Sequence, residues 1–314
     1  MITVNQLRKD YGATRAVDDI SFEIGAGEKF ILLGTSGCGK TTTLKMLNRL
    51  IAPTSGEIII DGKDVYTQNP DMLRRSIGYV LQGNSLFPHY TVAENIAIVP
   101  RLLGWDRRKI EDRCKELLDK LHLTADCANK YPAQLSGGQQ QRVNIARGLA
   151  ADPPILLMDE PFGALDTVTR SSIRNELIQL DEYRKKTIVM VTHDVDEAFE
   201  IGDKICLMDK GRIQQQGSAA ELLFRPVNDF VRNFLSDHYL QAALKTVKLR
   251  DIWYGFDAEV GKVVLTSDYS IWDAMELMDG NEAIYATDTK NGKVKKIDTD
   301  SLFRLFRQYT ATQQ

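Results

Sequence analysis

The chain has 314 residues, of which 43% are hydrophobic and 26% are charged, and its net charge is -3. This length and composition allow a large buried core with room for a second small unit, while the absence of a polybasic signature gives no reason to expect nucleic acid as a partner. No apolar run approaches the roughly 20 residues that span a bilayer, and Met1 to Asn5 lack a signal-peptide pattern, so we expect a cytoplasmic chain.

The first sixty residues predict short strands around a glycine-rich loop. Ile2–Gln6, Ile20–Ile24 and Ile58–Ile60 are β-rich, and glycine and proline mark turns between them. A further apolar run, Lys29–Leu33, is typical of a buried parallel strand, and Thr42–Leu50 has the apolar spacing of a helix. The loop between the last two segments therefore joins a strand to a helix.

This loop has the composition of a phosphate-binding loop. Gly34, Gly37 and Gly39 let the backbone N–H groups turn inward, and the start of the following helix adds partial positive charge. Lys40 is placed to reach the β- and γ-phosphates, and Thr41 to offer its hydroxyl to Mg²⁺. The predicted nucleotide-binding residues of this loop are Gly34, Thr35, Ser36, Gly37, Cys38, Gly39, Lys40, Thr41 and Thr42.

A helical region and a second glycine-containing loop come next. Residues 87–131 have leucines on apolar faces with charged residues between them, which predicts helices. Another helical pattern follows, and it is preceded by the small residues Ser136, Gly137 and Gly138 and by Gln139. One reading is a simple helix cap; the other is a second phosphate-binding loop. Because the first loop already wraps one nucleotide, the second reading requires another copy of the chain, paired head to tail around shared ATP.

Two more apolar runs predict central strands that end in polar residues. Ile155–Met158 is followed by Asp159 and Glu160, at the strand end where open α/β sheets bind ligands. We expect Asp159 on the magnesium side and Glu160 as the general base that activates or orients water. The run that ends at Val191 is followed closely by His193, an imidazole placed to donate to the γ-phosphate.

The remainder predicts the end of the parallel core and a separate tail. The core continues to about Met208 and closes with helical residues 221–235. After Asp237 the expected order is strand, helix, strand, strand, helix, with Asp288–Gly292 as a hairpin turn. The predicted segments are Val263–Leu265, Ile271–Met278, Ala283–Thr287, Val294–Ile297 and Leu302–Phe306.

Together these motifs resemble the ATP-binding subunits of ABC transporters, from about Met1 to Asp237. The resemblance implies that Tyr11 stacks on adenine and that Gln82 contacts magnesium and water and passes the nucleotide state to membrane subunits. It also implies that Asp166 acts across the dimer and that His193 contacts the γ-phosphate. The implied metal ligands are Thr41, Gln82 and Asp159, and the implied catalytic residues are Glu160, His193 and Gln82.

The resemblance also supplies the expected fold class and domains. It implies an α/β P-loop NTPase core with an antiparallel β subdomain and an inserted helical subdomain, plus a small α+β C-terminal unit similar to one CBS repeat. We expect a nucleotide-binding domain over 1–237, a linker over 238–250 and a degenerate CBS-like domain over 251–314. CBS repeats normally work in pairs, so a packing or dimerising role for the tail stands beside nucleotide sensing.

The solute and partners follow from resemblance alone. Residues 86–100 and 225–231 and the tail are similar to importers of quaternary ammonium osmoprotectants such as glycine betaine, carnitine and choline. Such a chain works as a homodimer with integral membrane permease subunits and a substrate-binding protein, at the cytoplasmic face of the membrane. The alternatives are an importer of another small solute, such as an amino acid or a polyamine, and an ABC ATPase that moves no solute.

Overall fold

The chain divides into two units in the computed structural model, which describes residues 1–83, 85–259, 261–278 and 282–313. The first unit consists of Met1–Asp194 and Cys206–Ile213. The second consists of Val195–Ile205 and Gln214–Gln314. The glycine-rich loop, both predicted acids and the predicted histidine all lie in the first unit.

A six-stranded sheet in the order β10-β9-β3-β8-β7-β6 forms the centre of the fold. Its strands are β3 (Lys29–Gly34), β6 (Ile77–Val80), β7 (Ile155–Asp159), β8 (Thr187–Thr192), β9 (Lys204–Asp209) and β10 (Arg212–Gly217). The pairs β3–β8, β8–β7 and β7–β6 are parallel. Every residue of β7 and β8 is buried, which explains why these strands are apolar runs without alternation.

A four-stranded sheet in the order β2-β1-β4-β5 forms the second layer of this unit. Its strands are β1 (Ile2–Tyr11), β2 (Thr14–Ile24), β4 (Ser55–Ile60) and β5 (Lys63–Asp64). All three of its strand pairs are antiparallel, so the β-rich start of the sequence folds as predicted. Side chains on alternate positions of β1 and β2 are buried, and they join those of β3 and β7 in one core.

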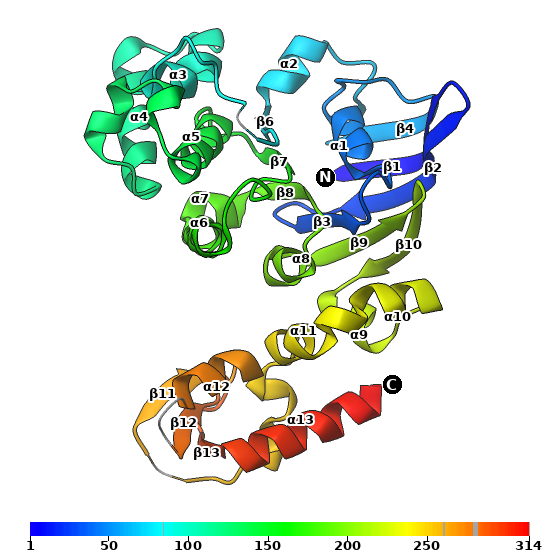
Figure 1. The fold of residues 1–314 in the computed structure, drawn as a ribbon, viewed down its shortest axis with the longest axis vertical. Coiled ribbons are helices and arrows are strands. Elements are labelled where there is room, and N and C mark those ends of the chain that lie inside the picture. Colours follow the sequence, from blue (N-terminus) through cyan, green and yellow to red (C-terminus); the bar gives the residue numbers. More distant parts are fainter. Residues whose placement is uncertain (84, 260, 279–281, 314) are drawn as a thin grey trace. The chain divides into compact units, whose positions relative to one another are not determined.

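Seven helices complete the described part of the first unit. They are α1 (Lys40–Leu47), α2 (Pro70–Arg75), α3 (Val92–Leu102), α4 (Arg107–Lys120), α5 (Gly137–Leu149), α6 (Thr167–Gln179) and α7 (Asp181–Lys185). In Figure 1, α3, α4 and α5 gather on one side of this unit, away from β1 and β2. The helical region predicted over 87–131 is thus confirmed as α3, α4 and the short 3-10 turn Ala125–Asn129.

The second unit contains the remaining helices and a three-stranded sheet. Its helices are α8 (Val195–Ile201), α9 (Ala219–Phe224), α10 (Asp229–Leu235), α11 (Tyr239–Thr246), α12 (Ile271–Met278) and α13 (Thr299–Gln313). The sheet has the order β11-β12-β13, with β11 (Val263–Thr266), β12 (Ala283–Thr287) and β13 (Val294–Asp298). The helical close predicted over 221–235 is interrupted at Arg225, before Pro226, because proline is poorly accommodated inside a helix.

The tail has the predicted order of strand, helix, strand, strand and helix. β12 and β13 pair antiparallel around the predicted hairpin turn, where the N–H of Asp288 donates to the carbonyl of Lys293. Helix α11 occupies most of the expected linker over 238–250 and groups with the tail. The predicted domain boundary at residue 237 stays a prediction, because the two units divide at other positions along the chain.

An ion cluster ties the helical group to the core of the first unit. Arg113 of α4 contacts Glu182 of α7 at 2.8 Å, and Lys120 contacts the same carboxylate at 2.6 Å. Burial alone would raise the pKa of Glu182, but the hydrogen bonds from Arg113 and Lys120 outweigh it and lower that pKa from 4.5 to about 2. The charged form of Glu182 thus stabilises the folded chain.

We predict that Glu182→Gln lowers the free energy of unfolding by about 1–3 kcal/mol at pH 7, because two cations lose their partly buried partner. The folded-state pKa is depressed, so this contribution is present above about pH 5 and is lost as the pH falls toward 2. Denaturant unfolding between pH 7 and pH 4 measures the difference. The exposed Glu111, which pairs with Arg107, supplies Glu111→Gln as the control. A difference between wild type and Glu182→Gln that does not shrink with falling pH contradicts this account.

Candidate functional site

The carboxyl ends of three parallel strands meet at one edge of the central sheet. Leu33 of β3 pairs with Thr192 of β8, and Asp159 of β7 pairs with Val191 of β8. Because these strands end at nearly the same level, the segments that follow them emerge side by side. The glycine-rich loop, the acid pair and the histidine, which are far apart in the sequence, are brought together in this way.

These segments enclose a cleft of about 420 Å³. It is lined by Ala16, Ser36, Gly37, Gly39, Lys40, Thr41, Thr42, Gln82, Glu160 and His193. Nine of these ten residues were predicted as site residues, and Ala16 is the exception. The cleft is of a size and polarity suited to a polyphosphate rather than to an apolar ligand.

The loop over 34–39 can curl only because of its glycines. Gly34, Gly37 and Gly39 have φ values of 150°, 77° and 106°, where residues with a side chain are strained. A Cβ atom on Gly34 would lie 2.1 Å from the carbonyl oxygen of Met208, and one on Gly39 would lie 2.4 Å from that of Ala16. The loop therefore lies directly against the neighbouring backbone, and α1 begins immediately after it at Lys40.

The side chains of Lys40 and Thr41, which line the cleft, are both fixed by hydrogen bonds. The ammonium of Lys40 is buried and donates to the carbonyls of Gly34 and Thr35, at 2.9 and 2.8 Å. The hydroxyl of Thr41 donates to Asp159 at 2.8 Å. Burial raises the pKa of Asp159, and the hydrogen bond from Thr41 only partly offsets this. A cation bound beside this carboxylate would hold it in its charged form.

Glu160 is the centre of a cluster of three side chains. The amide of Gln82 donates to one of its carboxylate oxygens at 2.9 Å, and Nδ1 of His193 lies 3.3 Å from the other. Glu160 itself has φ 43°, a left-handed conformation that is uncommon for a residue with a side chain. The strained backbone and the two partners fix the carboxylate so that it faces the cleft.

The second loop is ordered as a helix cap in this chain. The hydroxyl of Ser136 accepts from the N–H of Gln139, and the Gln139 side chain accepts from the N–H of Ser136, which is the reciprocal capping box. A Cβ atom on Gly138 would lie 2.8 Å from Thr169, so this helix start packs closely on α6. Among the described residues that line the cleft, none comes from 136–139.

Tyr11 and Asp166 were also predicted as site residues and do not line this cleft. Tyr11 is half exposed, and the ammonium of Lys9 lies 5.0 Å from the centre of its ring. Asp166 caps α6 by accepting from the N–H of Thr169 at 3.0 Å, and backbone hydrogen bonds of this kind lower the pKa of Asp166. Both side chains face solvent in the single chain, where a second subunit could reach them.

The sequence analysis missed Ala16, which lines the cleft, and Asp209, which contacts the glycine-rich loop. The carbonyl oxygen of Ala16 lies against Gly39 of the loop, and an alanine in the sequence carries no signal for such a contact. Asp209 accepts a hydrogen bond from Thr35 at 3.1 Å. Asp209 ends strand β9 directly after buried apolar residues. This is the same signal that identified Asp159 and His193, so Asp209 could have been found.

Comparison with known proteins identifies the family. The family model for the ABC transporter matches residues 17–163. The osmoprotectant import ATP-binding protein of Salmonella typhimurium is 46% identical over 252 residues, which are 80% of this chain and 66% of that protein. The glycine betaine uptake system ATP-binding protein of Escherichia coli is 44% identical over 277 residues, or 88% of this chain and 90% of that protein.

The solved structures agree with this. A dimeric structure of a bacterial ABC transporter cassette superposes on this chain with a TM-score of 0.63 at 37% identity. The superposition covers 69% of this chain and 98% of the cassette chain. The chain therefore belongs to the family of ABC transporter ATP-binding proteins. It spans just under two thirds of the length of the Salmonella relative. Within the described part of the chain, no helix has the length and apolar character needed to cross a bilayer.

Proposed function

We propose that this chain hydrolyses ATP to drive an ABC importer of a quaternary ammonium osmoprotectant, such as glycine betaine, carnitine or choline. The observation that carries the ATPase part is the carboxylate of Glu160, held between Gln82 and His193 and facing the same cleft as Lys40. The similarity to the osmoprotectant import protein of Salmonella typhimurium and to the glycine betaine uptake protein of Escherichia coli supports the solute class. Their identity to this chain extends well beyond the shared ATP-binding motifs.

The cleft suits the triphosphate and magnesium of ATP. The curled loop and Lys40 would bind the phosphates, and the proposed magnesium ligands are Thr41, Asp159 and Gln82. Hydroxyl, carboxylate and amide oxygens are donors that Mg²⁺ prefers, and the buried Asp159 gains from a neighbouring cation. Bound magnesium would neutralise charge that develops on the phosphate oxygens during hydrolysis.

The proposed chemistry is the attack of water on the γ-phosphate, which breaks the bond from the γ-phosphorus to the bridging oxygen and releases ADP and inorganic phosphate. Glu160 accepts a proton from this water, or orients it, while Gln82 and His193 hold the carboxylate in place. His193 also donates to the γ-phosphate, where charge accumulates. Because the carboxylate is already fixed before nucleotide binds, little reorganisation is needed at the moment of reaction.

A second copy of the chain would complete the site. Ser136–Gln139 begins an α-helix but lies outside the cleft of its own chain, so this anion-binding helix start is available to another nucleotide. In a head-to-tail pair, Ser136 of one copy meets the ATP of the other, Asp166 contacts the facing copy and Tyr11 stacks on adenine. The dimeric state of the similar bacterial cassette supports this arrangement. ATP then closes the dimer, and hydrolysis reopens it.

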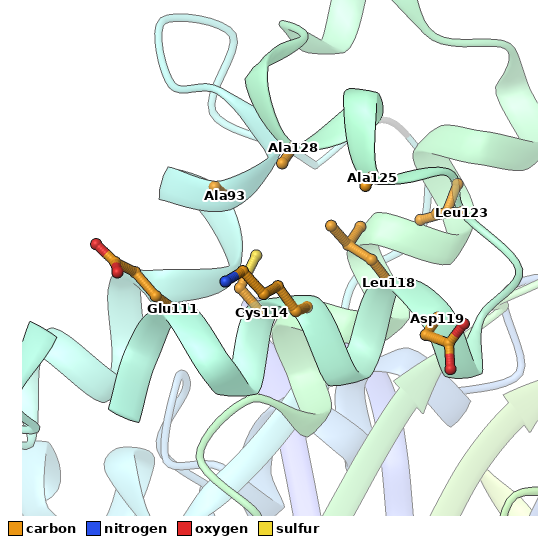
Figure 2. A pocket seen from close by; sticks show the side chains of 9 residues that line it. Ala93, Glu111, Cys114, Leu118, Asp119, Leu123, Ala125 and Ala128 are labelled. Atoms are coloured by element: carbon orange, nitrogen blue, oxygen red, sulfur yellow. The ribbon is translucent and has the colours of Figure 1, made fainter. Parts of the chain in front are cut away.

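The helical group offers a surface for the membrane subunits. A hollow of about 280 Å³ lies between the start of α3, one face of α4 and the turn over 125–129. Figure 2 shows Cys114 and Leu118 of α4 across from Ala93, Ala125 and Ala128, with Glu111 and Asp119 toward its ends. Alanines permit close approach of a helix, so we assign this hollow to a helical segment of a permease subunit at the cytoplasmic face of the membrane. A substrate-binding protein would deliver the solute from the other side.

The tail is proposed to be one CBS-like repeat with a dimerising role. Its strand, helix, strand, strand, helix order supports this reading, and its edge strand β11 exposes Val263 and Val264. An unpaired apolar edge strand favours association with another copy. The same segment in a second chain is therefore its expected partner.

We predict that Glu160→Gln lowers the rate of ATP hydrolysis by about 10²–10⁴-fold while ATP binding is retained, because a glutamine cannot accept the proton from water. With ATP, this variant accumulates as a closed dimer in size-exclusion chromatography. Glu57→Gln, an exposed residue with the same change of charge, is the control. Wild-type turnover by Glu160→Gln excludes Glu160 as the base.

The solute is tested in cells that lack this chain but keep its membrane partners. We expect uptake of radiolabelled glycine betaine to return with the wild-type chain and to stay absent with Glu160→Gln. Labelled amino acids and polyamines, tested in parallel, distinguish an importer of another small solute. If no solute enters but the purified chain hydrolyses ATP, the importer role is contradicted while the ATPase role stands.

A further inference from the structure

The loop that carries Gln82 is hydrogen-bonded to side chains of helix α5. The amide of Asn144 donates to the carbonyl of Leu81 at 2.9 Å. The guanidinium of Arg147 donates to the carbonyl of Ser85 at 2.8 Å and to its hydroxyl at 3.0 Å. Two side chains on one helix thus fix the backbone on both sides of Gln82.

Arg147 is an unusual residue to find in this position. Only 9% of it is exposed, and burial lowers the pKa of its guanidinium. Within the described ranges, no carboxylate forms an ion pair with it; the charge is instead met by Ser85, by the Asn144 oxygen at 2.9 Å and by the ring of Phe87 at 5.7 Å. Burying a cation without a counter-ion is costly, so a purely structural position would be better filled by an apolar side chain.

The same helix is pressed against the strand that leads to Gln82. A Cβ atom on Gly78 of β6 would lie 2.3 Å from the carbonyl oxygen of Gly148 in α5. One on Gly148 would lie 3.0 Å from Val80, the last residue of β6. Helix α5 therefore packs directly against the backbone of β6 at these two glycines, and this close packing ties the position of the helix to that of the strand leading to Gln82.

Helix α5 connects the two loops of the proposed mechanism. Helix α5 begins directly after Ser136, and its other end holds the segment from which Gln82 reaches Glu160. A displacement of the helix start would therefore change the distance between the Gln82 amide and the Glu160 carboxylate. Within the described ranges, no other helix both begins at the second loop and hydrogen-bonds to the Gln82 segment.

We propose that Arg147, with Asn144, is a positioning residue that sets Gln82 against Glu160 and links this contact to the helix that begins at Ser136. Arg147 touches neither the cleft nor the reacting atoms, so it acts only through Gln82. The inference rests on the proposed ATPase function and adds to it a residue that lies on α5 beyond Ser136–Gln139.

The test is a double-mutant cycle on steady-state ATP hydrolysis. We expect Arg147→Gln to lower kcat by about ten- to a hundredfold with little change in KM for ATP, because Gln82 is displaced but the phosphate loop is not. Gln82→Ala should lower kcat as well, and the double variant should be no slower than Gln82→Ala alone. Arg147→Lys, which keeps the charge and one donor, should restore part of the rate.

Arg142 supplies the matched control on the same helix. It donates to the carbonyl of Leu121 and pairs with Glu176, away from the Gln82 segment. The effects of Arg142→Gln and Gln82→Ala should therefore multiply. Amide exchange adds a second readout, because Arg147→Gln should accelerate exchange at Ser85 and Phe87 but not in α6. If Arg147→Gln fails to fold, Asn144→Ala replaces it in the cycle.

The outcomes separate this inference from the proposed function. If the wild type hydrolyses ATP and the effects of Arg147→Gln and Gln82→Ala multiply, the positioning role is overturned while the ATPase role stands. If the wild type shows no ATP hydrolysis, the proposed function itself fails. A double variant as fast as Gln82→Ala alone supports the link.

Discussion

The level register of three parallel strands is the constraint on which the site depends. β3, β8 and β7 are buried on both faces, so their relative positions are fixed by packing, and their carboxyl ends lie at one edge. The glycine loop, the acid pair and the histidine can then be short extensions of rigid strands. Because such groups need little ordering when a ligand arrives, the edge is well suited to catalysis.

A second constraint comes from helix α5, whose two ends contact different parts of the proposed site. Its start presents Ser136 and the glycines away from the chain's own cleft, whereas its later turns hold the segment of Gln82 through Asn144 and Arg147. The half-buried layer of α3 and α4 lies beside it and carries the hollow assigned to a permease subunit. One helix thus lies between the proposed dimer contact, the proposed catalytic carboxylate and the surface proposed for the membrane partner.

Much of the fold and of the site could be predicted from sequence, because it depends on local patterns. Apolar runs predicted the central strands, glycine spacing predicted the loop, and the positions directly after strands predicted that Glu160 and His193 lie together, as they do at the cleft. Asn144 and Arg147 could not be found in this way, because their hydrogen bonds depend on the tertiary contact between α5 and the loop that carries Gln82. Ala16 carries no signal in its side chain for its place beside Gly39, and the grouping of α11 with the tail depends on tertiary packing that periodicity does not reveal.

The central claim is that one chain's phosphate loop and another chain's Ser136 share a nucleotide, and mixing two inactive variants tests it directly. Lys40→Ala disables the loop, and Ser136→Arg disables the helix start of the facing chain. Each variant alone should hydrolyse ATP slowly, whereas their mixture should regain activity, because a mixed dimer contains one intact shared site. A mixture no more active than its components, or a Ser136→Arg chain as active as the wild type, would contradict the account.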